Sequence, residues 1–152
     1  MTTLRGAGIS VDVPDGWEGA IADGRFRPLS SGAVEPTLVH LASFPMPEGR
    51  GTFGAGAVEL MTSQDAMIIL LEYGPESVGT PLFESEGIPR DLDPGLFTPA
   101  GLQYGRPGQS GLQQFFSHQG RAFCLYVVLG SHIDRVDLVA RVNAVLDTLV
   151  IG

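Results

Sequence analysis

The chain has 152 residues, 43% of them apolar, which is enough to bury the core of one ordinary domain, so we expect a single domain over residues 1–152. The formal net charge is −8, and all nine basic residues are arginines. Because phosphate backbones and anionic lipids repel an acidic chain, we expect no nucleic-acid partner and no membrane partner. The lack of lysine in the sequence excludes Schiff-base catalysis by this chain.

The start of the chain lacks the charged and then apolar pattern of a secretion signal, and no apolar run reaches the length of a membrane span. We therefore expect a cytoplasmic protein. The arginine-only set of basic residues is typical of a GC-rich bacterial genome. Cys124 is the only cysteine, which excludes an internal disulfide, and its apolar neighbours predict a buried side chain that is no nucleophile.

The first third of the chain predicts three short strands. Residues 9–13 alternate apolar and polar side chains, as a half-buried strand does. Residues 14–16, Pro-Asp-Gly, end this strand in a turn, and Trp17 follows, so we expect its indole to fold back onto the core. Further strands are predicted over residues 24–28 and 37–44.

A glycine-rich loop and a buried strand are predicted in the middle of the chain. Residues 49–56 are rich in glycine, but Glu59 stands where a dinucleotide-binding loop needs its third glycine, so we expect no phosphate site. Residues 57–64 have the apolar spacing of a short helix. Residues 66–73 are apolar on both faces, which predicts a strand that is covered on both sides.

The segment from residue 75 to residue 111 combines many glycines and prolines with scattered large apolar side chains, which predicts a long loop packed against the domain. Phe97 and Tyr104 are the expected anchors of this loop. Residues 91–95 resemble the start of a calcium loop, but the closing glutamate is missing, so we interpret them as a turn. Ser110 lacks the glycine spacing of a nucleophile elbow and precedes a strand, so we expect no catalytic serine.

A hairpin and a helix are predicted at the end of the chain. Residues 112–118 and 121–130 form two strands joined by a tight turn at residues 119–120, and the second strand is apolar on both faces. Residues 131–147 follow as an amphipathic helix with a serine N-cap at the first position. A short last strand is predicted at residues 150–151.

Together these elements predict an α+β domain. We expect a central antiparallel β-sheet of about five to seven strands flanked by helices. The C-terminal amphipathic helix over residues 131–147 should pack on one face of this sheet. The two strands that are apolar on both faces, around Ile69 and around Val127, should lie away from water at its centre.

Two segments resemble the PsbP-like domains, and several uncharacterised actinobacterial proteins share the same layout. The opening strand and turn, residues 8–17, are similar to the start of these domains, and the closing strand and helix, ending at residues 142–149, are similar to their end. The resemblance implies a central antiparallel sheet flanked by helices. It also implies a non-enzymatic role, since members of that fold mostly act as assembly factors, adaptors or chaperones.

The predicted sheet suggests one candidate binding surface. Phe115 and Phe116 point to opposite faces of one strand, so either helices cover both faces or one face forms a groove beneath the 75–111 segment. Arg90 and Arg106 flank that segment, and each either holds a ligand carboxylate or pairs with a local acid. The predicted ligand-binding or partner-binding residues are Arg90, Phe97, Tyr104, Arg106 and Phe115.

We expect no cofactor and no metal, since the three histidines lack metal-binding spacing and have no cysteine partner. The sequence favours a non-catalytic binding, adaptor or chaperone-like module that engages a protein partner or a small apolar ligand through a loop-covered sheet face. A first alternative is an enzyme with a site assembled from dispersed polar residues, for example His118, Arg90 and either Asp91 or Asp93. A second is a structural subunit of a homo-oligomer, such as a homodimer formed through an uncovered sheet face.

Overall fold

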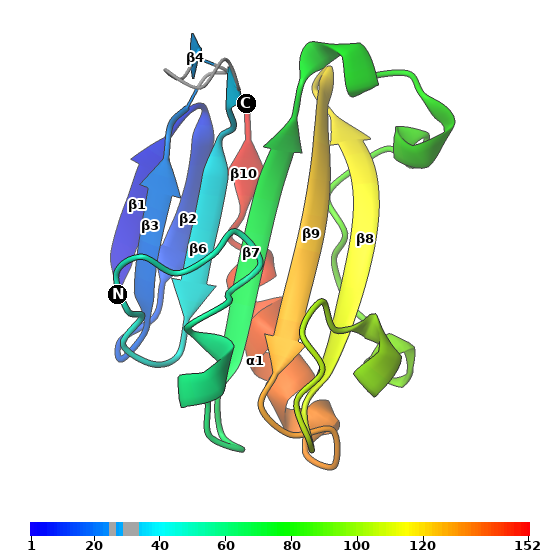
Figure 1. Ribbon diagram of the computed structural model, residues 1–152. Coiled ribbons are helices and arrows are strands. Elements are labelled where there is room, and N and C mark those ends of the chain that lie inside the picture. Colours follow the sequence, from blue (N-terminus) through cyan, green and yellow to red (C-terminus); the bar gives the residue numbers. More distant parts are fainter. Residues whose placement is uncertain (25–26, 29–33) are drawn as a thin grey trace.

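The structure is a computed structural model that describes residues 1–24, 27–28 and 34–152 (Figure 1). The described residues contain one α-helix, α1 (Arg135–Leu146). The strands are β1 (Thr2–Gly6), β2 (Ile9–Val13), β3 (Glu18–Ala22), β4 (Arg27–Pro28), β5 (Val34–Glu35), β6 (Leu38–Ala42), β7 (Ala66–Tyr73), β8 (Ser110–His118), β9 (Arg121–Leu129) and β10 (Val150–Ile151). The short 3₁₀ turns are η1 (Val58–Leu60), η2 (Pro75–Ser77), η3 (Pro81–Phe83), η4 (Pro94–Leu96) and η5 (Pro99–Gly101).

The central feature is a five-stranded antiparallel sheet with the strand order β3-β6-β7-β9-β8, which we call the large sheet. A second antiparallel sheet contains β1, β2 and β10, and β4 pairs with β5. The predicted central antiparallel sheet and the short last strand are therefore confirmed. β4 forms the end of the strand predicted over residues 24–28, of which residues 25 and 26 lie outside the described residues.

The strands β7 and β9 lie at the centre of the large sheet because they are apolar on both faces. Ile69 and Val127, around which these strands were predicted, are both buried. β8 and β9 form the predicted hairpin, and its turn residues Gln119 and Gly120 have positive φ values of 52° and 73°. Two positive φ values in a two-residue loop match the right-handed twist of the flanking strands.

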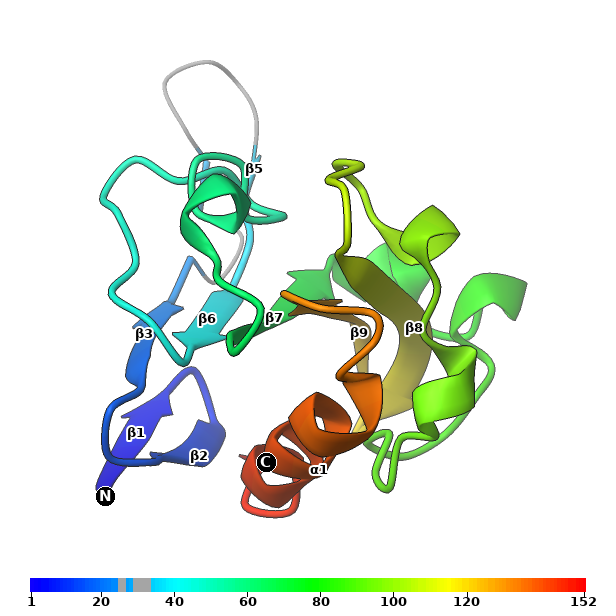
Figure 2. The same ribbon diagram turned by 90° about the horizontal axis from the view of Figure 1, so that it is seen from below.

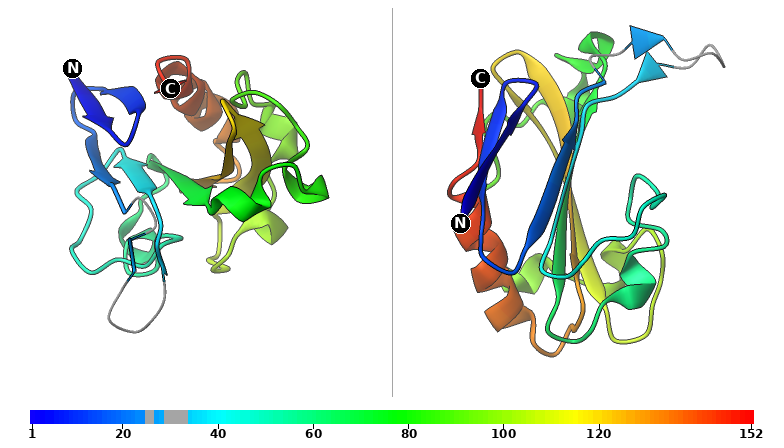
Figure 3. Two further views of the ribbon diagram at one scale, coloured as in Figure 1. Left: turned by 90° about the horizontal axis from the view of Figure 1, so that it is seen from above. Right: turned by 90° about the vertical axis from the view of Figure 1, so that its left-hand side faces the viewer.

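One face of the large sheet is covered by α1 and by the three-stranded sheet, which lie side by side (Figures 2 and 3). Apolar side chains of α1, β2 and β10 pack there against β6, β7, β8 and β9 in one continuous core. The prediction that the C-terminal amphipathic helix packs on the sheet is confirmed. The two layers are held together because the apolar face of α1 and the facing sides of the two sheets are buried in this one core.

A partly buried ion pair joins β7 to β9 at the margin of this core and reaches Gly152, the residue after β10. Arg121 donates from Nη2 and Nε to the two carboxylate oxygens of Glu72, over 2.7 and 2.9 Å. Its Nη1 donates to the main-chain oxygen of Gly152 over 3.0 Å. The hydrogen bonds to Glu72 raise the pKa of Arg121, so the guanidinium stays charged and holds the last residue to the sheet.

The opposite face of the large sheet is covered by loops and 3₁₀ turns, so the prediction that helices flank the sheet is wrong: α1 is the one α-helix in the described part of the chain. The helix predicted over residues 57–64 is reduced to η1. The Asp65 carboxylate accepts hydrogen bonds from the main-chain N–H and the hydroxyl of Thr62, over 2.9 and 3.0 Å, and this turn stands where the helix would continue. A helix of about eight residues has too little stability of its own to resist such a turn.

The 75–111 segment packs along the outer side of β8, as the scattered apolar residues predict. Phe83 contacts the ring of Phe115 on one face of the large sheet, and Phe97 lies in the core on the other face. Two isolated β-bridges join the segment to β8, Glu86–Ser117 and Thr98–Gly111. The β8 edge is therefore covered, whereas no described strand pairs with the outer edge of β3.

Two predictions about single residues have different outcomes. Ser131 does not cap α1 directly, because its hydroxyl accepts from the Asp134 N–H over 3.2 Å and closes a turn before the helix begins at Arg135. Cys124 is buried as predicted, and burial raises the pKa of its thiol. No helix among the described residues has the length and apolarity needed to cross a membrane.

Candidate functional site

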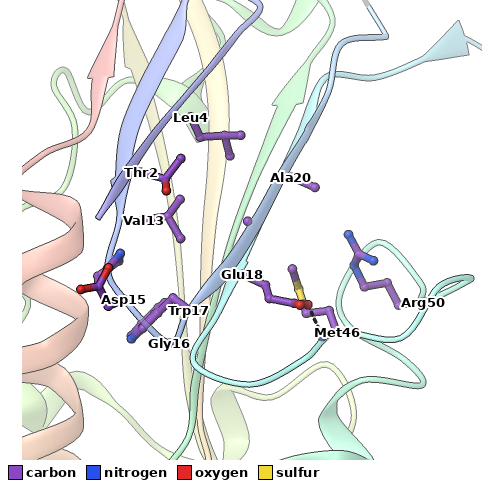
Figure 4. Close-up of a pocket in the computed structure, with 12 residues that line it drawn as sticks. Thr2, Leu4, Val13, Asp15, Gly16, Trp17, Glu18, Ala20, Met46 and Arg50 are labelled. Atoms are coloured by element: carbon purple, nitrogen blue, oxygen red, sulfur yellow. Dashed lines mark hydrogen bonds between the residues drawn. The ribbon is translucent and has the colours of Figure 1, made fainter.

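A groove of about 570 Å³ runs along the open edge of β3, and we call it the β3 groove (Figure 4). Figure 4 looks onto this edge, with Leu4 and Val13 on one side of the strand and Met46 and Arg50 on the other. Trp17 lies at one end, where the turn between β2 and β3 closes the groove. The groove therefore has a strand edge at its base and a wall against each face of the sheet.

The apolar wall of the β3 groove exists because the β1–β2 hairpin lies directly on β3. Gly19 permits this close approach, since a Cβ atom there would lie 3.1 Å from Val13 Cγ2 and 3.2 Å from Leu4 Cδ2. Along β3 the burial alternates: Gly19 and Ile21 are half-buried, and the other three residues of the strand are exposed. A glycine on the inward side thus brings Leu4 and Val13 to the edge of the large sheet.

Trp17 is held in place at the end of the groove by two contacts. Its main-chain N–H donates to the carbonyl oxygen of Pro14 over 3.0 Å, which closes the predicted turn. The guanidinium of Arg141, on α1, lies 5.8 Å from the centroid of the indole ring. The indole is half-buried against the core, as predicted, and it is the only tryptophan of the chain, so its fluorescence reports on the groove.

The second wall is fixed to the sheet by hydrogen bonds. Glu18 Oε1 accepts from the Met46 N–H over 2.8 Å. Arg50 donates from Nε to His40 Nδ1 over 2.8 Å and from Nη1 to the Pro47 carbonyl oxygen over 3.0 Å. The loop that carries Met46 and Arg50 is therefore tied to β3 through one residue and to β6 through another.

His40 acts as a neutral brace between β6 and this loop. Because Nδ1 accepts from Arg50, the ring proton is on Nε2, which donates to the Thr52 carbonyl oxygen over 2.9 Å. Burial lowers the pKa of His40, and the nearby charge of Arg50 lowers it further, against the opposing effect of the hydrogen bond to Thr52. The neutral ring is the only form that can accept the hydrogen bond from Arg50.

The rim of the β3 groove is acidic. Asp15 and Glu18 line the groove, and Glu48 is exposed in the loop that forms the second wall. The Met1 ammonium group hydrogen-bonds to the Asp15 carboxylate and lowers its pKa, so Asp15 stays ionised while the ammonium offsets its negative charge. Among the lining residues Arg50 is the one cationic side chain, and two of its nitrogens already have acceptors. Both acceptors are neutral, so Arg50 keeps one positive charge on the second wall. The negative charge of the rim comes from Glu18, which lines the groove, and from Glu48, which lies two residues from Met46 along the chain.

The lining of the groove combines apolar and charged groups. It contains neither histidine nor cysteine. Over the described residues, no group of three or more His, Cys, Asp and Glu side chains is placed to hold a metal ion. The groove presents apolar area, a strand edge and the charged side chains of Asp15, Glu18 and Arg50.

The structure does not bring the five predicted binding residues together, and none of them lines the β3 groove. Phe97 is 1% exposed in the core beneath α1. Tyr104 is 42% exposed on the opposite face, and Arg106 is exposed in the loop before β8. Phe97 thus anchors the 75–111 segment as predicted, whereas Tyr104 remains largely in solvent.

Phe115 belongs to an aromatic cluster on the loop-covered face of the large sheet. Its ring lies 6.2 Å from that of Tyr73 and 5.6 Å from that of Phe83, in edge-to-face geometry. Residues 85–89 and Phe115 also line a pocket of about 460 Å³ at the β8 edge. A pocket therefore lies between the 75–111 segment and the strand of Phe115, and ligand binding there stays a prediction.

Arg90 donates to main-chain oxygens at and just beyond the C-terminal end of α1 and not to a local acid, and its binding of a ligand carboxylate stays a prediction. Its Nη2 donates to the Leu149 carbonyl oxygen over 2.7 Å, and its Nη1 donates to that of Leu146. The carbonyl groups at a helix C-terminus have no partners within the helix and carry partial negative charge. The Arg90 guanidinium supplies hydrogen-bond donors to carbonyl groups at this end of the helix. No sequence pattern links residue 90 to residues 146 and 149.

The residues of the alternative enzyme site are only partly close together. Arg90 and His118 border one pocket of about 330 Å³. Asp91 and Asp93 do not line this pocket, and the Asp93 carboxylate accepts a main-chain hydrogen bond at the start of η4. Ser110 is buried, and none of the described residues hydrogen-bonds to its hydroxyl, so no base activates it.

Comparison with known proteins adds no information on function, so the function of the groove is interpreted from its geometry. No protein-family model, no curated protein and no solved structure matches the chain. The resemblance to PsbP-like domains therefore stays a prediction, and so does the role that it implies. The β3 groove was missed from the sequence because β3 itself was not predicted.

Proposed function

We propose that this protein is a non-catalytic binding module, of the adaptor or chaperone-like kind, whose ligand lies in the β3 groove. The observation that carries the proposal is an open groove of about 570 Å³ with apolar walls at Leu4, Val13 and Met46 and a tryptophan at its end. Ligand sites of this apolar kind have volumes of about 300–1,000 Å³. The proposed ligand is a polypeptide segment or a small apolar molecule, and the predicted setting is the cytoplasm of a bacterium.

The non-catalytic part of the proposal is supported by the partners of the polar groups in the groove. Glu18 accepts from the main chain of Met46, and Arg50 donates to His40 and to the main chain. General acid–base catalysis needs a titratable side chain that reaches the substrate and has a pKa near the working pH. The polar groups described at the groove instead fix its walls, which is what a rigid recognition surface requires.

The proposed site lies at the side of the large sheet and replaces the expectation of a groove beneath the 75–111 segment. That segment inserts Phe97 into the core and packs Phe83 against Phe115, so much of its underside is filled by side chains, and the pocket beside Phe115 is smaller than the β3 groove. The β3 edge has walls and an open base between them. An open site between fixed walls can admit a ligand without displacing part of the core.

The test is a fluorescence titration that uses Trp17 as the reporter. N-phenylnaphthylamine serves as a neutral apolar probe, and a pool of short peptides with alternating apolar residues serves as the polypeptide probe. We expect at least one probe to change the emission of Trp17. The variant Ala20→Tyr should lower the affinity about tenfold, because a large side chain on this lining residue fills the groove.

Ala100→Tyr is the matched control, since Ala100 is exposed in η5 beside the opposite edge of the large sheet and does not line the groove. Its affinity should stay within about twofold of that of the original chain. Circular dichroism checks that both variants are folded. Equal loss in both variants, or no response of Trp17 to either probe, would contradict the proposal.

A further inference from the structure

The outer edge of β3 has main-chain groups without strand partners. β3 pairs with β6 on one side only. In an antiparallel edge strand, alternate residues direct their N–H and C=O groups away from the sheet. Among the described residues, the one main-chain hydrogen bond that β3 makes outside its ladder joins the Ala22 carbonyl oxygen to the Gly24 N–H, over 3.1 Å.

The β3 groove follows this edge, which gives it the shape of a slot for one extended chain. Figure 4 shows Glu18 and Ala20 along the base, with Leu4 on one side and Met46 on the other. Neighbouring strands in a sheet lie about 4.8 Å apart, so a chain in the slot would lie within hydrogen-bonding reach of β3. The slot thus offers main-chain partners at its base and side-chain contacts at both walls.

We infer that β3 accepts an extended segment of a partner protein as a sixth strand of the large sheet. This inference rests on the proposed function and specifies its ligand. Side chains of an added strand alternate between the two faces of the sheet. One set would pack on Leu4, Val13 and Trp17, and the other set would lie beside Met46 and Glu18. Main-chain hydrogen bonds would supply affinity, and the two walls would supply selectivity.

The negative rim specifies the charge of the partner. Glu18 and Glu48 carry charges that have no cationic partner in the described structure, and the chain as a whole has a net charge of −8. An acidic segment would be repelled from this surface and a basic one attracted to it. The partner segment therefore combines apolar residues on one side with lysine or arginine on the other.

The same walls disfavour a second copy of this chain as the occupant. Pairing of two β3 edges would bring the β1–β2 hairpin and the Met46 loop of each copy against those of the other. It would also place two negative rims close together, at an energetic cost from like charges. A flexible segment from another protein has no such walls, so it fits where a second folded edge does not.

Three synthetic peptides of about seven residues, long enough to span β3, test the inference. In each peptide valine alternates with a second residue, which is lysine, serine or glutamate. We expect affinity in the order lysine, serine, glutamate, measured by Trp17 fluorescence. Glu18→Gln keeps an oxygen acceptor for the Met46 N–H and should weaken the lysine peptide about threefold. Glu84→Gln, an exposed glutamate beside the β8 edge, should leave the affinity unchanged.

Methylation of peptide nitrogens separates strand pairing from other modes of binding. Two versions of the lysine peptide carry N-methyl groups on alternate residues, in registers that differ by one. In one version the methyl groups face β3 and remove its hydrogen bonds, so affinity should fall about tenfold or more, while the other version keeps most of its affinity.

The outcomes distinguish failure of the inference from failure of the proposed function. If both methylated versions bind as tightly as the parent peptide, or if the glutamate peptide binds most tightly, strand addition of a basic segment is wrong although the groove binds. If N-phenylnaphthylamine alone changes Trp17 emission, the ligand is a small apolar molecule. If light scattering shows a dimer that Ala20→Tyr dissociates, the occupant is a second copy. If nothing affects Trp17, the proposed function fails as well.

Discussion

The two edge strands of the large sheet, β8 and β3, differ in how far the rest of the chain covers them. Along β8, the 75–111 segment adds bridges to the strand and places Phe83 and Phe97 on opposite faces of the sheet. Along β3, the chain supplies walls but no covering segment, and the strand edge opens into the β3 groove. Figure 2 shows both edges in one view, with β8 and β3 at opposite ends of the sheet.

This difference is informative because uncovered edge strands favour aggregation, and natural proteins cover or shorten them. A long segment of this chain covers one edge. The other edge is protected in a weaker way, by the shortness of β3, which has 5 residues, and by the charge of Glu18. We interpret the covered edge as structural and the open edge as the one kept available for a partner.

Truncation of Phe97 should destabilise the packing that covers the β8 edge, and among the variants in this Discussion it should lower the free energy of unfolding the most. Phe97 is 1% exposed, so Phe97→Ala leaves a cavity in the core beneath α1. The free energy of unfolding, measured in urea, should fall by about 3–5 kcal/mol. The loosened 75–111 segment should also expose the β8 edge, so light scattering on warming should detect aggregation at lower temperature.

The neighbouring Leu96 provides the control for this variant. It is 52% exposed, so Leu96→Ala should change the free energy of unfolding by no more than about 0.5 kcal/mol. If the two variants have equal stability, the 75–111 segment does not anchor at Phe97. If Phe97→Ala is destabilised but remains monomeric on warming, the segment is not what protects the β8 edge.

Much of the large sheet could be predicted because its central strands are apolar on both faces. The run from Ala66 to Leu71 and the run from Ala122 to Leu129 are apolar or uncharged at every position, as a doubly covered strand is, and all of their residues except the half-buried Leu71 are buried. The cover of the second face could not be predicted. Whether residues 57–64 continue as a helix depends on the capture of the Thr62 N–H by Asp65, a local competition that periodicity does not reveal.

The candidate site was harder to predict than the fold. β3 contains two alanines and a glycine in five residues, and these types have low strand propensity, so its pattern is weak. Met46 and Arg50 come from a loop with no periodicity, and they reach β3 only through tertiary hydrogen bonds. Trp17 was the available signal, because a half-buried aromatic directly after a turn marks a place where two layers meet.

The variant Gly19→Ala should test whether the packing of the β1–β2 hairpin on β3, at the open edge, depends on a glycine. In Gly19→Ala the new Cβ would lie 2.7 Å from Leu41 Cδ2 and 3.1 Å from Val13 Cγ2, so either these side chains or the β1–β2 hairpin must shift. We expect the free energy of unfolding to fall by about 1–2 kcal/mol and the emission of Trp17 to change. Gly105→Ala is the control, since a Cβ there meets nothing within 4 Å. Equal stabilities would mean that the hairpin does not depend on Gly19.

The smallest expected effect is a pH dependence of the second wall. The pKa of His40 lies below its ordinary value of 6.5, chiefly because the ring is buried. The unfolded chain therefore binds the proton more readily than the folded protein does. The contribution of His40 to stability is complete above about pH 6.5 and is lost as the pH falls through the folded pKa.

This dependence can be measured with one variant and one control. His40→Asn removes the titrating ring, so its free energy of unfolding should fall less between about pH 7.5 and about pH 5 than that of the original chain. Thr52→Ala keeps the main-chain oxygen that accepts from His40, so it should retain the full pH dependence. If His40→Asn keeps the full dependence too, another group is responsible. In that case acid would not loosen the Met46 wall, and the open edge would be as rigid at low pH as the covered one.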